Sequence, residues 1–267
     1  MSGTDQTAAA LLRAGKLDDA VAAAQAALRK SPTDLNARVL LGELLIFAGN
    51  LERADVVLDA ASAIDPTTAV VVAEFRQLIR ADMARRQLFR DGRVPEFLAD
   101  PTETQRLQLA ALVALRSGDL AEAARQAEAA EAVRPIVAGH HGDAAFDDLR
   151  DADDLMAGSF EVLTTTGKYF WIPTERVQTL EFHPPKRPRD LLWRRASMSV
   201  ADGPDGEVYL PVVYATDDPM TDALRLGRQT DWRQVEPGPV RGIGQRLFIV
   251  GEDAVGIMDL GNIRFGE

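Results

Sequence analysis

Residues that can bind a metal ion stand together in the middle of the chain. His140 and His141 are followed by six aspartates between positions 143 and 154, and imidazole and carboxylate groups bind divalent cations. The run lacks the spacing and the glycine of an EF-hand loop, and aspartate runs more often form a solvated, capping or salt-bridged face. We therefore predict no metal site and no cofactor. We expect a short helix from Ala144 to Met156, and the segment's further role stays open.

The chain lacks the motifs that usually carry nucleophilic or phosphate chemistry. It has no cysteine, which excludes thiolate catalysis, disulfides and cysteine-bound metals. No serine stands in a G-x-S-x-G elbow, and there is no G-x-x-x-x-G-K-[ST] loop. The stretch GPVRGIGQR, residues 238–246, has a G-x-G without a third glycine, and we predict a turn there. Asp153 and Asp154 are adjacent carboxylates, but acid and base roles require a pocket. We predict a protein that is not an enzyme.

A basic segment, FHPPKRPRDLLWRRA, covers residues 182–196. Its arginines could bind phosphate, but the net charge of −11 opposes general binding to nucleic acid or to an anionic membrane surface. We expect the segment to pair with the chain's own carboxylates. Because arginine and tryptophan are enriched at interface hot spots, Trp193 and Arg194 are also candidate partner contacts.

Three aromatic residues in a row, Tyr169, Phe170 and Trp171, stand in the stretch GKYFWIPTERVQTLEF. In a strand, the first and third share one face and the second takes the other. We expect one face to meet the sheet core. The other should meet residues 191–193 or the end of a helical array. We therefore interpret the run as core and interface together, with Trp171 and Trp193 as candidate core residues.

These side chains must be positioned by two halves of different composition. The first is rich in Ala and Leu, whereas all three Trp and all three Tyr come after residue 135. Ala and Leu favour helices, and aromatic residues with frequent Gly and Pro favour strands and turns. We predict an α+β protein, with a helical domain over 1–135 and a β-rich domain over 136–267.

The helical half contains a repeat of about 34 residues. Its prolines, Pro32, Pro66, Pro101 and Pro135, keep this spacing, and so do Gly15 and Gly49. Each unit resembles AGKLDDAVAAAQAALRKSP: a glycine ends one helix, the next helix begins at a leucine, and a small residue allows close packing. The small residues at equivalent places are Ala20, Ala54 and Ala123.

The units differ in regularity and in their caps. The third unit, 67–101, lacks the turn glycine, so VVVAEFRQLIRADMARRQLF predicts one long amphipathic helix. We expect Ser31, Asp65 and Asp100 to be helix N-caps that precede proline at the first helical position. Asp34 and Glu103 would then complete capping boxes.

Alternating and apolar runs separated by turn formers predict a mostly antiparallel sheet in the second half. The predicted strands are 159–164, 169–172, 177–182, 196–201, 207–214, 246–250 and 254–260.

Two resemblances follow from these motifs. The 34-residue units resemble the tetratricopeptide repeat. The segments FDDLRDADD, GKYFWIPTERVQTLEFHPPKRPRDLLWRRA and GEVYLPVVY resemble the ImpE family, also called SciE-type or TagJ proteins, over essentially the whole chain. His183 is a variation on that family's FEPP-type motif. The resemblance implies a cytoplasmic, non-enzymatic accessory component of a bacterial type VI secretion system. It also implies contact with the TssB-type small sheath subunit and a link to the AAA+ ATPase ClpV in sheath recycling.

We therefore predict a protein-binding adaptor whose repeat array takes an amphipathic helix of a sheath subunit in a groove. A generic helical-repeat scaffold for another protein, or an enzyme with its site in the β-rich half, are the alternatives. No stretch of about 18 apolar residues suggests a membrane span, and the sequence leaves the oligomeric state open. The candidate contacts, with Trp193 and Arg194, are Leu12, Asn36, Arg38, Leu41, Leu45 and Phe75.

Overall fold

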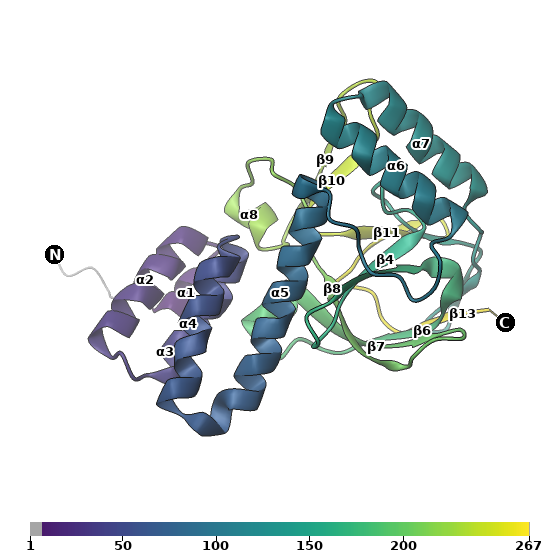
Figure 1. Ribbon diagram of the computed structural model, residues 1–267. Helices are drawn as coiled ribbons and strands as arrows, with labels where there is room; N and C mark the ends of the chain where they lie inside the picture. Colours follow the sequence, from purple (N-terminus) through teal and green to yellow (C-terminus); the bar gives the residue numbers. More distant parts are fainter. Residues whose placement is uncertain (1–6, 267) are drawn as a thin grey trace.

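The computed structural model describes residues 7–266 of the chain and shows helices followed by strands (Figure 1). The α-helices are α1 Ala8–Arg13, α2 Leu17–Lys30, α3 Leu35–Phe47, α4 Leu51–Ile64, α5 Ala69–Asp91, α6 Glu103–Ser117, α7 Leu120–Val133 and α8 Asp222–Arg225. Helices α1 to α7 precede every strand, which confirms the predicted helix-then-sheet order. No helix in the described part of the chain is long and apolar enough to cross a membrane.

Small residues let the paired helices approach closely. Ala20, Ala54 and Ala123 are fully buried, as their equivalent places in the repeat predict. Gly49, between α3 and α4, has a φ of +77°, a conformation that glycine adopts without strain. Gly42 lies so close to α4 that a Cβ there would be 2.9 Å from the Leu58 side chain. The spacing of small residues in the sequence therefore sets how tightly the repeat packs.

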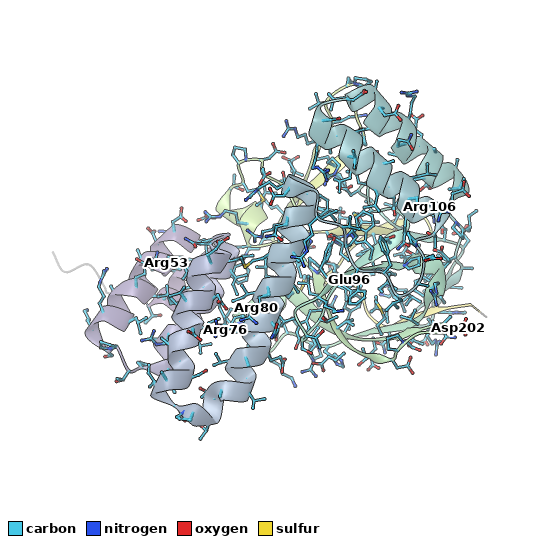
Figure 2. All side chains as sticks on the ribbon, in the orientation of Figure 1. Arg53, Arg76, Arg80, Glu96, Arg106 and Asp202 are labelled. Atoms are coloured by element: carbon cyan, nitrogen blue, oxygen red, sulfur yellow. The ribbon has the colours of Figure 1, made fainter. Side chains whose placement is uncertain are left out.

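The third unit is the predicted long helix, because α5 runs unbroken for 23 residues and ends at the left-handed Gly92. Figure 1 shows α5 between the first four helices and the sheet. Its charged side also faces α4, where Arg76 Nε donates to Asp55 Oδ1 at 2.7 Å (Figure 2). Helix α5 thus contacts both α4 and, through β4 and β5, the strands.

The predicted caps are correct at only one of three positions. Asp65 caps a short 3-10 helix, η1 Pro66–Thr68, by accepting from Thr67 N at 2.9 Å. Ser31 instead ends α2, and Asp34 itself caps α3 by accepting from Ala37 N at 3.0 Å.

Before α6 the cap is Thr102, not Asp100. Thr102 and Gln105 form a reciprocal capping box, and Glu103 is the first residue of α6. The assignments of Ser31 and Asp100 were wrong because each helix begins a few residues after its proline, so a later residue reaches the free backbone N–H groups.

The second half forms three β-sheets. The largest has the order β2-β1-β13-β6-β7-β8-β4-β5, and two smaller ones are β12-β11-β3 and β10-β9. All of their strand pairs are antiparallel, which confirms the predicted type of sheet. The strands are β1 Gly139–His141, β2 Ala144–Phe146, β3 Leu149–Asp151, β4 Ser159–Leu163, β5 Tyr169–Pro173, β6 Val177–Phe182, β7 Trp193–Val200, β8 Gly206–Pro211, β9 Thr230–Arg233, β10 Arg241–Gly244, β11 Leu247–Val250, β12 Asp253–Gly256 and β13 Ile263–Phe265.

Each of the seven predicted strands overlaps an observed one, but two local predictions were wrong. The expected helix from Ala144 to Met156 is instead the strands β2 and β3 followed by turns. Its aspartates are held by arginines and backbone N–H groups of the sheets, which outweighs the weak helical pattern. The expected turn at 238–246 contains β10, which pairs with β9 through Gly242 and Trp232.

The aromatic run is core, as predicted for its first and third residues. Tyr169 and Trp171 on β5 are 3% and 1% exposed, and Trp193 on β7 is 1% exposed. Phe75 from α5 meets Trp193 edge to face with ring centroids 6.1 Å apart. One continuous apolar cluster therefore includes residues of both the helices and the sheets.

Candidate partner-binding site

Most of the apolar side chains proposed as partner contacts lie inside the protein. Leu12, Leu41, Leu45, Phe75 and Trp193 are each at most 8% exposed. They fill the spaces between helices and, for the last two, between α5 and β7. Their burial favours a packing role, and a direct contact with a partner stays a prediction.

The two polar candidates on α3 lie nearer to the surface. Asn36 is exposed in the first turn of α3, and Arg38 is half-buried. Arg38 Nη2 donates to Pro32 O at 2.7 Å, so it fastens the connection before its own helix. Within residues 7–266, the Asn36 side chain makes no hydrogen bond or ion pair, so of this pair it is the one free to contact a partner.

Arg194 is buried beneath the sheet. Its guanidinium lies 4.3 Å from the Phe182 ring centroid and donates to Ile257 O. Burial lowers the pKa of Arg194 to about 10. The side chain therefore anchors β7 to a turn rather than pointing outward.

The rest of the basic segment docks the helices onto the sheet. The short 3-10 helix η3, Pro188–Leu191, contacts α3 and β7, and Arg189 lies 4.4 Å from the Phe75 ring centroid. Asp190 accepts from the backbone N–H groups of Lys186 and Arg187 at 2.8 and 3.0 Å. Arg195 pairs with Glu207 at 3.0 Å. The predicted pairing with the chain's own carboxylates is confirmed for Arg195, whereas Asp190 accepts from backbone N–H groups and Arg194 donates to a backbone carbonyl.

Glu43 on α3 faces this docked segment from the helical side. It is 4% exposed, and its Oε1 atom has no hydrogen-bond partner. Burial raises the pKa of Glu43 to about 7, and the nearby charges of Arg189 and Arg187 only partly oppose that effect. The contact between α3 and η3 therefore carries a carboxyl group whose ionisation near neutral pH is unfavourable.

A buried ionic network links α5 to the strands β3 and β4. Arg85 donates to both oxygens of Glu161 on β4, at 2.8 and 2.9 Å, and Arg246 bridges Glu161 and Asp151 on β3. All four side chains are at most 5% exposed. Burial alone would raise the pKa of Glu161, but the two guanidiniums outweigh it and lower the value to about 2.

The aromatic run extends this network. Trp171 Nε1 donates to Tyr169 Oη at 2.6 Å, and the Tyr169 hydroxyl donates to Glu161. Sequence reasoning missed Arg85, Glu161 and Arg246. Glu161 stands between apolar residues in SFEVL, where strand alternation suggests a solvent-facing position. Arg85 of α5, Arg246 and Tyr169 cover it instead.

Three of the six aspartates are bound to arginines, which agrees with the salt-bridged alternative. Asp148 Oδ2 accepts from Arg134 at 2.6 Å, and Asp153 accepts from Arg241 Nε at 2.9 Å. His141 Nε2 accepts from Gly261 N at 2.8 Å. Within residues 7–266, no group of three or more His, Cys, Asp or Glu side chains is arranged to hold a metal ion.

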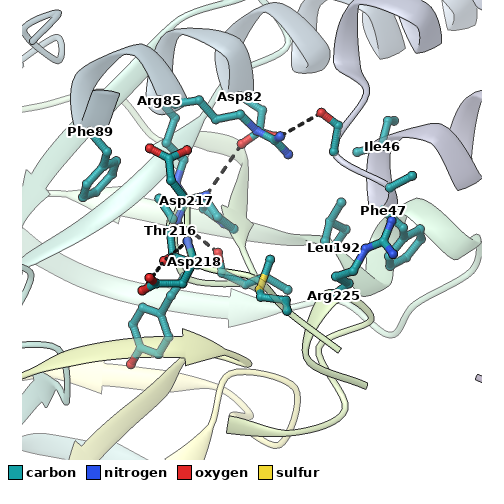
Figure 3. Close-up of a pocket in the computed structure, with 18 of the residues that line it drawn as sticks. Ile46, Phe47, Asp82, Arg85, Phe89, Leu192, Thr216, Asp217, Asp218 and Arg225 are labelled. Carbon is teal, nitrogen blue, oxygen red and sulfur yellow. Dashed lines mark hydrogen bonds and ion pairs between the residues drawn. The ribbon is translucent and has the colours of Figure 1, made fainter. Parts of the chain in front are cut away.

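A cleft of about 350 Å³ opens where the helices meet the sheet. Figure 3 shows its three sides: Ile46 and Phe47 at the end of α3, Asp82 and Arg85 on α5, and the loop that contains Asp217. Apolar side chains line part of it, including Phe89, Leu192 and Met220. The structure thus brings together three segments that are far apart in the sequence.

Comparison with known proteins identifies the family. The family model described as ImpE protein matches residues 143–264, and a tetratricopeptide repeat model matches residues 11–75. The chain is 34% identical, over 258 residues, to the type VI secretion system accessory component TagJ of Pseudomonas aeruginosa PAO1, and this match covers 96% of the chain and 89% of the relative.

A solved structure supports the fold over the whole length. The crystal structure of protein VPA1032 from Vibrio parahaemolyticus has a TM-score of 0.92 and 29% identity, with 97% of each chain covered. The helical repeats, the sheets and the junction between them are therefore one shared architecture. Together with the 34% identity to TagJ, these matches show that the chain belongs to the ImpE family of type VI secretion accessory proteins.

Proposed function

We propose that this protein is a non-enzymatic adaptor in the cytoplasm that binds the TssB-type small subunit of the type VI secretion sheath. The observation that carries the proposal is the match to the TagJ accessory component over 96% of the chain. Tetratricopeptide-like repeats, which usually bind a peptide or helix of another protein, support a role in protein recognition.

The chemistry of the described residues agrees with binding rather than catalysis. Glu161, one of the most strongly perturbed carboxylates, is buried and tied to arginines, so its lowered pKa follows from structural pairing. Proton transfer to a substrate would require such a group to be reachable.

The experiment is a calorimetric titration of the full chain with the N-terminal segment of its own organism's sheath small subunit. We expect saturable binding with one site. A scrambled peptide of the same composition is the control. Absence of heat with the native peptide, together with failure of the folded chain to bind the intact sheath subunit, would contradict the proposal.

A link to the ATPase ClpV belongs to the same proposal in a weaker form, because only the family resemblance supports it. Its measurement is the ATPase rate of ClpV on assembled sheath, with and without this protein. A changed rate that disappears when sheath is left out would support an adaptor between the two. An unchanged rate would restrict the protein to the sheath subunit.

A further inference from the structure

The cleft between α3, α5 and the 214–220 loop has an apolar wall and a buried carboxylate oxygen that accepts no hydrogen bond. Asp82 on α5 lines it and is 2% exposed. Its Oδ1 atom has no hydrogen-bond partner; the nearest charge to that atom is Arg85 Nη1, 3.7 Å away. A buried carboxylate oxygen without a donor carries a desolvation cost that a donor from a ligand would remove.

The cationic groups of the same cleft are already engaged. Arg85 is bound to Glu161, and Arg86 Nη1 donates to Gly49 O at 3.0 Å while its Nη2 lies 3.3 Å from Asp82. Arg90 pairs with Asp217 at 3.1 Å. Arg225 pairs with Asp18 and Asp222, each at 3.1 Å. An incoming group would therefore find acceptors more readily than free donors.

The geometry of α3 adds to this preference. The helix ends at Phe47, and Phe47 to Gly49 line the cleft. The C-terminal end of a helix carries a partial negative charge that favours cations. Asp217, whose side chain is 72% exposed at the rim, is paired with Arg90 through Oδ1 and adds negative charge there.

The apolar wall can hold a hydrophobic side chain beside that cation. Ile46, Phe47, Leu192 and the half-buried Met220 line the cleft. Methionine adapts its shape to a bound side chain. The volume is at the lower end of the range for ligand pockets, roughly 300–1,000 Å³, which suits a few anchoring side chains rather than a whole helix.

We propose that this cleft is the docking site for an amphipathic helix of a protein partner that inserts a lysine or arginine toward Asp82 and an adjacent apolar side chain against Ile46 and Met220. The inference rests on the proposed function and names the chemistry of its partner. It also moves the site from the repeat side chains named above to residues that line the cleft. The net charge of −11 on this chain would speed the approach of a basic segment.

The test uses the full chain with a fluorescent reporter in the cleft. Because the chain has no cysteine, Ala48→Cys provides one labelling site on the cleft wall. The probes are a designed Leu/Lys amphipathic helix, its Leu/Glu twin, and the N-terminal segment of the sheath small subunit. We expect the Leu/Lys helix to change the reporter's fluorescence and the Leu/Glu twin to leave it unchanged.

Charge variants sharpen the assignment. Asp217→Lys should weaken binding of the Leu/Lys helix about tenfold at low salt, and less at high salt where rim charges are screened. Asp82→Asn should weaken it similarly. The matched control is Asp205→Lys, an equal charge change at the exposed far end of the β7–β8 hairpin, and it should leave affinity within twofold. Thermal melts establish that each variant is folded.

The outcomes separate this inference from the proposed function. Binding of the Leu/Lys helix in the cleft without binding of the sheath segment supports the inference and overturns the proposed partner. Binding of the sheath segment with an unchanged reporter, at equal affinity to Asp217→Lys, overturns the inference and keeps the proposed partner. If neither peptide binds, or the Leu/Glu twin binds as well as Leu/Lys, the cleft is not a site for a basic helix.

Discussion

The helical repeats and the junction with the sheets are held together in different ways. Between α2, α3 and α4, side chains such as Ala20, Ala54 and Leu58 are completely buried and apolar. At the junction, Arg85, Glu161 and Arg246 are buried together and charged. Apolar packing tolerates small errors of position, whereas a buried ion pair is favourable only in one geometry. We infer that apolar packing stabilises the repeats without selecting one exact geometry. The buried ion pairs of the junction, in contrast, fix the position of α5 on the sheets.

The largest expected effect is at the junction. Glu161→Gln should reduce the free energy of unfolding by about 3–5 kcal/mol, because it leaves two buried guanidiniums without a compensating charge. The measurement is urea denaturation at pH 7. Glu96→Gln, which removes the same charge from an exposed pair with Lys168, should cost at most about 1 kcal/mol.

The stability difference between wild type and Glu161→Gln should also depend on pH, which gives a further check. Because the pKa of Glu161 is lowered from 4.5 to about 2, its contribution is present above pH 4.5 and is lost as the pH falls toward 2. The difference in the free energy of unfolding between wild type and Glu161→Gln should therefore become smaller as the pH falls over that range. If Glu161→Gln and Glu96→Gln lowered the free energy of unfolding equally at pH 7, the buried junction pair would be no more important for stability than an exposed pair.

Loss of the aromatic contact across the junction should have the next largest effect on stability. Trp193→Ala, like Trp171→Ala, should cost about 3–5 kcal/mol, because each leaves a large cavity in the core. Thermal and urea unfolding measure it. Trp232→Ala is the matched control, since that ring is 40% exposed. If Trp193→Ala melted like the control and only partner binding failed, Trp193 would be a surface contact.

Glu43 gives a pH-dependent effect at the contact of α3 with η3. Its folded-state pKa is raised from 4.5 to about 7, so stability from this group is full below pH 4.5 and is lost as the pH rises through 7. Glu43→Gln should therefore match wild type near pH 4.5 and exceed it by about 3 kcal/mol at pH 8. The exposed Glu52→Gln should show no such trend, and a Glu43→Gln variant that is less stable at pH 8 would contradict the assignment.

The smallest expected effect on stability is at the N-cap of α6, in the helical part. Thr102→Ala should cost about 1 kcal/mol, because it removes the cap of α6. Asp100→Ala, at the position that the sequence pattern favours, should change stability by only a few tenths of a kcal/mol. Chemical denaturation distinguishes the two, and the reverse order would restore Asp100 as the cap.

The order of elements could be predicted because its signals are local. The glycine and alanine spacing identified the paired helices, the missing glycine identified α5 as one helix, and alternation located the main strands. Local signals failed where long-range contacts decide. The segment 144–156 forms β2, β3 and a turn, in which Asp153 binds Arg241 from 88 residues away, and no window of sequence contains that pairing.

At the candidate site, too, local sequence signals identified the apolar positions, whereas long-range packing decided which of them are buried. The sequence indicated that Leu41, Leu45 and Phe75 are apolar positions of the repeat, but their faces are covered by neighbouring helices and by β7, so they became core. Asp82 carried no signal in the sequence, since one aspartate on an amphipathic helix usually faces solvent. Composition and periodicity by themselves determined the paired helices, the main strands and the absence of cysteine chemistry. Only the tertiary structure decided which charges are buried and where a cleft opens, because burial depends on what packs against a residue from distant parts of the chain.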